Sequence, residues 1–95
     1  MTVDVVGAGG LAGIPHGFFG RRGGVSKGAM WGLNTGYGSG DDRSAIAENR
    51  RLTVAAVLPG ARLVTVHQVH GAAAVEAGDW PEESRPHADA LVTDR

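Results

Sequence analysis

Hydrophobic and polar positions along the chain predict one helix. From about residue 42 to 58, apolar residues recur at helical spacing, with Ile46 and Asn49 on one side of the helical wheel and Glu48 on the other. Acidic and hydroxyl side chains at the start of this segment can cap its first amides, and Pro59 with the glycine after it stops the helix. We therefore expect one main helix at about 42–58.

Short runs of apolar residues predict the strands. Residues 62–69 show the best alternation and are expected to form the main strand, with 72–77 as its antiparallel partner. Further short strands are expected at 3–6, 14–19 and 88–93. The pattern predicts an α/β (α+β) fold, in which one helix accompanies a mixed or antiparallel sheet that is incomplete within this chain.

Glycine dominates the front half of the chain. Of the 16 glycines among 95 residues, thirteen fall between Gly7 and Gly40. Residues 20–40 are therefore expected to form a long loop with brief extended pieces. A front half with so few side chains has little material for a core, so we expect this chain to be part of a larger domain.

Charge and composition narrow the classes of partner. The net charge is −1, with both signs mixed along the chain, so no electrostatic footprint for nucleic acid or an acidic membrane surface is present. No cysteine is present, which excludes a disulfide or a thiolate site within this sequence. No apolar stretch reaches the length of a membrane span, and the start lacks the features of a signal peptide. We expect a cytoplasmic location, and the oligomeric state stays open.

Two glycine motifs resemble functional signatures but lack the structural context of those signatures. Val5–Gly13 looks like a dinucleotide-binding turn, yet the helix it needs would run through Pro15 and several glycines. Glycine costs about 1 kcal/mol and proline about 3 kcal/mol in a helix interior. Gly24–Gly28 matches the pattern of a nucleophile elbow, but no buried strand precedes it. We interpret Ser26 as a turn residue that bonds nearby backbone.

The segment 65–71 concentrates the ionisable chemistry of the chain. At the end of the predicted strand, His70 is followed by a glycine that lets the chain turn. This placement would project a neutral imidazole into an opening, as a metal ligand or a general base. By spacing alone, a structural or surface histidine is the commoner alternative. His16 and His67 are expected to be structural, and His87 to lie on the surface.

An ordered set of motifs covers about residues 14 to 95. The motifs are His16-Gly17-Phe18-Phe19-Gly20-Arg21-Arg22-Gly23-Gly24-Val25-Ser26-Lys27-Gly28, Leu33-Asn34, Gly40-Asp41-Asp42, Glu48-Asn49-Arg50-Arg51, Gln68-Val69-His70-Gly71 and Ala88-Asp89-Ala90-Leu91-Val92-Thr93. Together they resemble the N-terminal part of the laccase-domain (YfiH-like) family, also called multicopper polyphenol oxidases or purine nucleoside phosphorylases. We interpret residues 1–95 as the N-terminal portion of a single laccase-like domain, with 1–13 outside the family motifs.

This resemblance implies a fold and a metal site. The family fold is a layered mixed-sheet sandwich, and its active site holds a metal, usually zinc and alternatively copper. Of the three family ligands, only one histidine transfers to this sequence, as His70, which is also the candidate catalytic residue. The remainder of the domain would supply a cysteine, expected shortly after Arg95, and a second histidine. This portion is therefore expected to be inactive alone.

The resemblance also implies an activity. The intact parent is expected to be a metal-dependent purine nucleoside phosphorylase, with phosphate as co-substrate and adenosine, inosine, guanosine or methylthioadenosine as the nucleoside. Adenosine deamination is a further activity attributed to the family. The alternatives are a copper-dependent polyphenol oxidase (laccase) and, from another class, a non-catalytic interaction fragment. A multicopper site needs many clustered histidines, and this chain offers no such cluster.

Candidate substrate contacts lie in the glycine-rich half and in the helix. Arg21 is our candidate for the phosphate, because a guanidinium forms bidentate hydrogen bonds to that anion. A solvated surface arginine is the alternative. Asn34 and Asn49 are candidates for orienting the nucleoside, or else bond loop backbone.

Two positions depart from the family pattern. Gly20 stands where the family commonly has threonine before the arginine, and Gly32 stands where serine commonly precedes the Leu-Asn pair. Both changes remove a hydroxyl group from the loop, so its hydrogen bonding is expected to differ.

Overall fold

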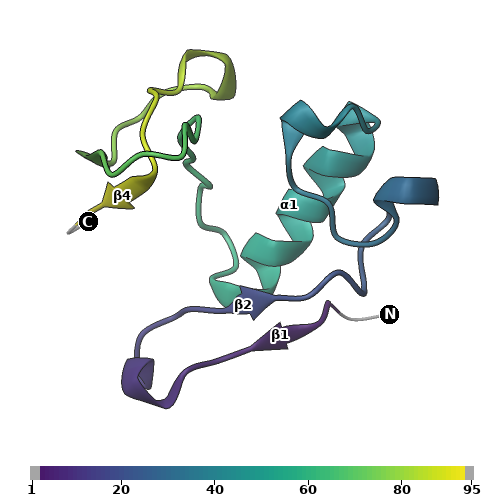
Figure 1. Cartoon of the computed structure of the whole chain (residues 1–95). Helices are drawn as coiled ribbons and strands as arrows, with labels where there is room; N and C mark the ends of the chain where they lie inside the picture. Colours follow the sequence, from purple (N-terminus) through teal and green to yellow (C-terminus); the bar gives the residue numbers. More distant parts are fainter. Residues whose placement is uncertain (1–2, 94–95) are drawn as a thin grey trace. The chain divides into compact units, whose positions relative to one another are not determined.

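A computed structural model describes residues 3–93, which form a small α+β fold with one α-helix and two small sheets (Figure 1). The chain divides into two compact units, Met1–Ala61 and Arg62–Arg95. The combination of one α-helix with two small sheets confirms the predicted α+β fold class. Among the residues described, no helix is both long and apolar enough to cross a membrane.

The first unit begins with a short antiparallel hairpin. Strand β1 (Val5–Val6) pairs with strand β2 (Phe18–Phe19), with Val5 opposite Phe19. Both strands lie within the predicted ranges but are shorter. Figure 1 shows the two strands side by side, joined by a connection that contains a 3-10 helix at Gly9–Leu11.

His16 orders the connection between these strands. Its Nε2 accepts a hydrogen bond from the Ala8 amide at 2.9 Å, and its Nδ1 lies 2.6 Å from the Ile14 carbonyl oxygen. These contacts fix the tautomer, since Nδ1 must carry the proton that it donates to the carbonyl. His16 therefore has the structural role that the sequence predicts.

Helix α1 (Arg43–Val57) confirms the predicted helix to within one residue at each end. The Asp42 side chain accepts a hydrogen bond from the Ser44 amide at 3.0 Å, which caps the first turn. Ile46 and Asn49 are fully buried on the predicted inner side. On the outer side Arg51 forms an exposed ion pair with Glu48, of the kind that contributes little to stability.

Backbone contacts hold the glycine-rich loop together. Ser26 and Gly32 form an isolated antiparallel bridge, and the Leu33 amide donates to the Arg21 carbonyl at 2.6 Å. A side chain at Gly24 would meet the backbone of Gly32, and one at Gly32 would meet the backbone of Arg21. Two 3-10 helices lie in this region, at Gly28–Met30 and Tyr37–Ser39.

Tyr37 connects the loop to the helix. The guanidinium carbons of Arg43 and Arg50 lie 4.4 Å and 4.5 Å from its ring centroid, so two helix arginines flank the ring. Arg50 also donates from Nε to the Thr35 carbonyl at 2.8 Å. These contacts hold the loop against the N-terminal half of α1, and Figure 1 shows the loop beside the start of that helix.

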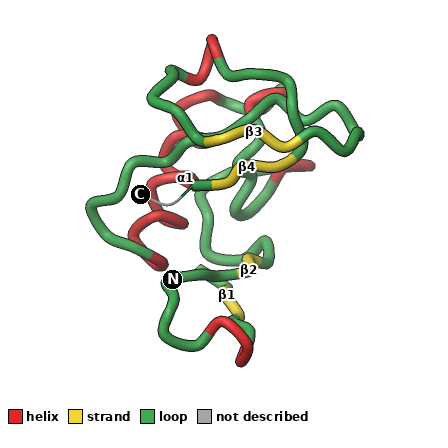
Figure 2. The backbone as a smooth tube through the Cα atoms, turned by 90° about the vertical axis from the view of Figure 1, so that its left-hand side faces the viewer, coloured by secondary structure: helices red, strands yellow, loops and turns green. Residues whose placement is uncertain are grey.

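The second unit contains a parallel strand pair. Strand β3 (Ala74–Glu76) pairs with strand β4 (Ala90–Val92), with Ala74 opposite Ala90 (Figure 2). Ala88, just before β4, is fully buried. The strands predicted at 72–77 and 88–93 are confirmed, but the predicted antiparallel pairing of 72–77 with 62–69 is wrong.

The predicted main strand at 62–69 is also wrong, because its only ladder contact is a single bridge between His67 and His87. Its carbonyls are instead used by side chains: Trp80 donates from Nε1 to the Thr65 carbonyl at 2.8 Å. A strand needs the backbone of a partner strand. The segment that follows His87 forms β4, and β4 pairs with β3 instead of with residues 62–69. Alternation alone therefore overestimated the pairing here.

Candidate functional site

The candidate site is a loop that interrupts a parallel ladder. His67 pairs with His87, and pairing resumes where Ala74 meets Ala90. Seven residue steps separate the two paired positions on the first segment and only three on the second. The four additional residues must bulge out of the ladder, and the Gln-Val-His-Gly motif lies in that bulge.

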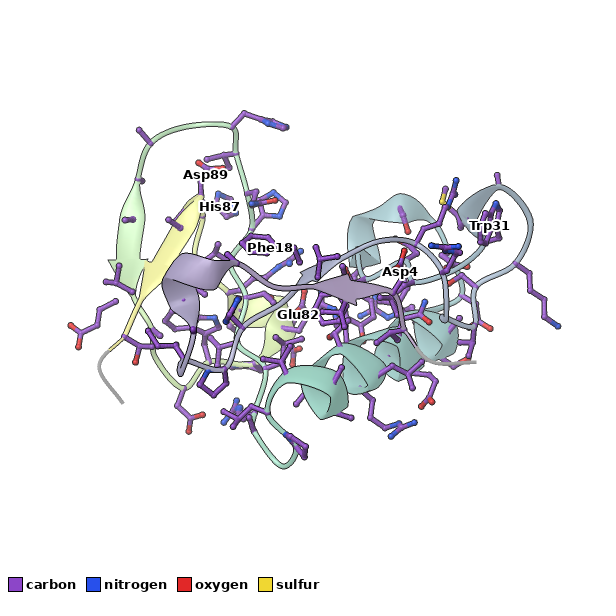
Figure 3. All side chains as sticks on the ribbon, turned by 90° about the horizontal axis from the view of Figure 1, so that it is seen from below. Asp4, Phe18, Trp31, Glu82, His87 and Asp89 are labelled. Carbon is purple, nitrogen blue, oxygen red and sulfur yellow. The ribbon has the colours of Figure 1, made fainter. Side chains whose placement is uncertain are left out.

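One carboxylate satisfies the amides of this loop. The Oδ1 atom of Asp89 accepts hydrogen bonds from the Val69 and His70 amides at 2.9 Å and 2.8 Å, and Oδ2 accepts from the Gly71 amide at 2.7 Å. The Asp89 amide in turn donates to the Ala73 carbonyl at 2.9 Å. Figure 3 labels Asp89 near His87, beside β4. The side chain and the amide of Asp89 therefore hold both ends of the loop at residues 69–73.

These amides explain the acidity of the carboxyl group. The Gly71 amide makes the largest contribution, and with the Val69 and His70 amides and the nearby His70 ring it lowers the pKa of Asp89 below its usual range, against a smaller opposing effect of burial. The same contact limits position 71, since a Cβ atom there would lie 3.2 Å from Asp89 Oδ2. Asp89 is thus held as the carboxylate, the form that accepts all three bonds.

His70 has a left-handed backbone. Its φ of 60° makes it the one non-glycine residue with positive φ in the described chain. The sequence placed His70 at the end of an extended strand, which is wrong in this detail, because a left-handed residue turns the chain instead. Its side chain is exposed, and no described residue hydrogen bonds to the imidazole. Both ring nitrogens are thus accessible.

An imidazole in this position fits the role of one metal ligand. Zinc and copper both accept imidazole nitrogen, and a structural or catalytic zinc site takes three or four protein ligands. Within residues 3–93 no three His, Cys, Asp or Glu side chains gather closely enough to hold a metal ion. His67 lies instead against His87, with ring centroids 4.6 Å apart. The described residues thus offer His70 as one donor of a site that needs others.

Arg21, the candidate phosphate contact, lies on Trp31. Its guanidinium carbon is 4.5 Å from the Trp31 ring centroid, and its Nε donates to the Trp31 carbonyl at 3.2 Å. The structure records no hydrogen bond from its two terminal nitrogens to another described residue. The side chain is exposed, so those nitrogens remain available to an anion. Its neighbour Arg22 instead forms an ion pair with Asp4 at 3.3 Å.

Asn49, a candidate substrate contact, is fully buried and uses its whole amide group within the first unit. Its Oδ1 accepts from the Val25 amide at 2.8 Å. Its Nδ2 donates to Ser26 Oγ and to the Asn34 carbonyl, each at 2.8 Å. These bonds agree with the alternative in which Asn49 bonds the loop backbone.

Asn34 belongs to the same network. Its Nδ2 donates to Ser39 Oγ at 2.7 Å and to Asp41 Oδ2 at 3.2 Å, and its Oδ1 accepts from the Gly36 amide at 3.2 Å. Ser26 donates to the same Asp41 oxygen at 2.5 Å, which, with the weaker Asn34 bond, lowers the pKa of Asp41 below its usual range. Ser26 is 7% exposed and held in this network, in keeping with a structural role.

Two acidic residues were missed as functional candidates. Asp89 is an unremarked member of a motif in the sequence, and its partners lie eighteen to twenty positions earlier. Asp41 precedes the helix and reads as a capping residue, although Asp42 supplies the cap. The one signal in the sequence is the glycine after His70, because it indicates a turn whose amides leave the ladder and need other acceptors.

Comparison with known proteins gives a consistent family. Residues 15–95 match the family model described as multi-copper polyphenol oxidoreductase laccase. A purine nucleoside phosphorylase of Streptomyces coelicolor is 41% identical over 83 residues, which cover 85% of this chain and 34% of the relative. Purine nucleoside phosphorylases of Mycobacterium tuberculosis and Deinococcus radiodurans are 45% and 42% identical, covering 77% and 84% of this chain and 30% of each relative. The chain spans about a third of the length of these curated relatives.

Proposed function

Because this chain belongs to the multi-copper polyphenol oxidoreductase laccase family, we propose that it is the N-terminal portion of a single laccase-like domain whose intact parent is a metal-dependent purine nucleoside phosphorylase. The observation that carries the activity is that relatives at 40–45% identity are all named purine nucleoside phosphorylases. The exposed imidazole of His70, on a loop fixed by Asp89, supports the metal dependence. Purine nucleosides and phosphate would be the substrates, with methylthioadenosine among them and adenosine deamination as a further activity.

His70 supplies one nitrogen ligand in this proposal, and the remainder of the domain supplies a cysteine and a second histidine. Such a nitrogen and sulfur set suits zinc, with copper as the alternative. A bound metal of this kind supplies Lewis-acid polarisation of a substrate or water oxygen. His70 itself presents its imidazole on an exposed loop, where the main chain bound by Asp89 fixes the backbone from which the ring projects.

Arg21 contacts phosphate in this proposal. Its terminal nitrogens are available, and the Trp31 ring and carbonyl restrict the motion of the guanidinium. Substrate binding by Asn34 and Asn49 stays a prediction. Their hydrogen bonds support the alternative in which they hold the loop that carries Arg21.

Phosphorolysis is tested with the purified intact parent. We expect free purine to be released from inosine or adenosine only when phosphate is present, and His70→Ala to abolish this turnover together with bound metal. His70→Asn is the sharper variant, because asparagine tolerates a positive φ and so keeps the loop backbone while removing the imidazole. Metal content is measured by elemental analysis.

A control and the alternatives belong to the same assay. His87→Asn alters another exposed histidine of the same unit, to which no ligand role is assigned, and should retain turnover. Phosphate-independent phenol oxidation that needs added copper would favour the oxidase named in the family description. Undiminished phosphorolysis in His70→Asn would reject His70 as the ligand.

A further inference from the structure

We infer that Asp89 is a positioning residue: its carboxylate fixes the main chain of residues 69–71 so that the His70 imidazole is presented to a metal. This inference rests on the proposed function, in which His70 is a ligand. In this inference Asp89 acts through the main chain and not as a ligand, and its three hydrogen bonds are all to amides of the loop.

The amides concerned have no partner in the ladder. The ladder is interrupted between the His67–His87 bridge and the Ala74–Ala90 pair, so the loop between them has no strand partner. Amides that leave a ladder need another acceptor, which is either water or a side chain. Asp89 provides one at 2.7–2.9 Å to three consecutive residues.

The same contacts hold His70 in a conformation that it would not adopt by itself. A positive φ is uncommon for histidine and persists only when the surroundings impose it. The bonds to the amides on both sides of His70, at Val69 and Gly71, impose it here. Without them we expect the loop to sample other backbone conformations and the imidazole to lose its fixed base.

A ligand with a fixed base binds metal more tightly than one that must first be ordered. Removing outer-sphere partners of ligand residues typically weakens metal binding roughly 10- to 100-fold. The effect of Asp89 should be of this size and should appear in metal affinity, beyond any change in stability.

The test measures zinc dissociation constants in the intact parent, with zinc alone as the probe and a chromophoric chelator as competitor. In Asp89→Asn we expect zinc binding to weaken roughly tenfold or more. We also expect faster hydrogen exchange of the amides of residues 69–71, and a changed visible spectrum when cobalt replaces zinc. Asp79→Asn, the same substitution at an exposed aspartate of this unit, should change none of these.

A second control separates positioning from stability. Leu91→Ala weakens β4 without removing an acceptor from the loop, and should lower the unfolding temperature while leaving zinc affinity within about twofold. Equal losses of zinc affinity in Leu91→Ala and Asp89→Asn would overturn the inference. If Asp89→Asn does not fold, Asp89→Glu replaces it, because the extra methylene shifts both oxygens from their 2.7–2.9 Å contacts with the amides. Zinc affinity and amide exchange should then change together, and a loss of zinc affinity without faster exchange of residues 69–71 would overturn the inference.

The two proposals fail differently. Weaker zinc binding in His70→Asn with wild-type binding in Asp89→Asn would overturn the positioning role and leave His70 as the ligand. Wild-type zinc binding in His70→Asn would reject His70 itself, and the positioning role with it.

Discussion

Gly32 shows how one residue sets the geometry of the glycine-rich loop. Its φ is +99°, a conformation that side chains other than glycine rarely adopt. A Cβ atom there would also lie well inside van der Waals contact of the Arg21 carbonyl oxygen, which already accepts the Leu33 amide. The loop is thus closed at Gly32 by backbone contacts that leave no room for a side chain. At Gly20, by contrast, an added Cβ atom would meet only the side chain of Asp4, which can move aside more easily than backbone.

Gly32→Ser is expected to destabilise the folded protein by roughly 2 kcal/mol or more, because the new side chain meets both strain and backbone. Chemical denaturation of the purified variant measures this as a lower midpoint. Gly38→Ser is the matched control, since a Cβ at Gly38 meets nothing within 4 Å, and its effect should stay within about 0.5 kcal/mol. Equal effects of the two substitutions would contradict the steric argument.

Arg21 allows a second prediction for a single residue. Arg21→Gln in the intact parent should raise the KM for phosphate roughly tenfold or more, because charge-assisted hydrogen bonds to the anion are lost. Its KM for the nucleoside should change much less. Arg22→Gln removes the same charge from a side chain that is paired with Asp4, and should have little effect on either constant. Steady-state kinetics with phosphate varied separate the two variants, and parallel effects would argue for general electrostatics.

The helix and its preceding loop behave as one element because a polar network joins them. Asn49 of α1 and Asp41 before it share Ser26 as a partner, with each bond at 2.8 Å or less. The helix itself was predictable from the sequence, since its cap, its apolar side and its stop are all local signals. The pairing of Asn49 with the loop was not, because its partners lie 15 to 24 positions away.

This network predicts a pH dependence. Hydrogen bonds from Ser26 and then Asn34 lower the pKa of Asp41 in the folded protein, so its charged form stabilises the fold above the unfolded carboxyl pKa of about 4. That contribution is lost as the pH falls through the lower folded value. Thermal unfolding of wild type and Asp41→Asn should therefore differ most above about pH 5, and the gap should narrow below about pH 4.

Asp42→Asn is the neighbouring control for this experiment. Asparagine is as good an N-cap as aspartate, so the variant changes the adjacent charge and keeps the cap of α1. The unfolding temperature of Asp42→Asn should stay close to that of wild type over the whole pH range. A gap for Asp41→Asn that does not narrow in acid would show that the carboxylate form contributes nothing.

At the scale of the whole molecule, the chain carries a family signature over residues 15–95 but spans about a third of its curated relatives. The sequence predicted the fold class, the helix and the two strands of the second unit. It predicted a main strand at 62–69 that does not form, because alternation identifies residues able to form a strand and says nothing of the backbone available to pair with them. It pointed to His70 through the motif, whereas Asp89 required the three-dimensional proximity of segments distant in sequence.

Metal retention should differ between this chain and its intact parent. One imidazole binds zinc weakly, and no three potential ligands gather within residues 3–93. After dialysis against a chelator of moderate affinity, the 95-residue chain should retain far less than one zinc per molecule, and the intact parent close to one. Elemental analysis of both decides this. Stoichiometric zinc in the shorter chain would mean that it builds a site from donors other than those proposed.

The carboxylate of Asp89 recognises only main-chain amides, which has a consequence for variation around the imidazole. The side chain of Val69, 48% exposed, takes no part in the contacts that shape the loop. Substitutions at position 69 can therefore change the polarity and bulk beside the ring while its direction is preserved. If the proposed function holds, a library at that one position would alter the surroundings of the ligand without rebuilding the scaffold.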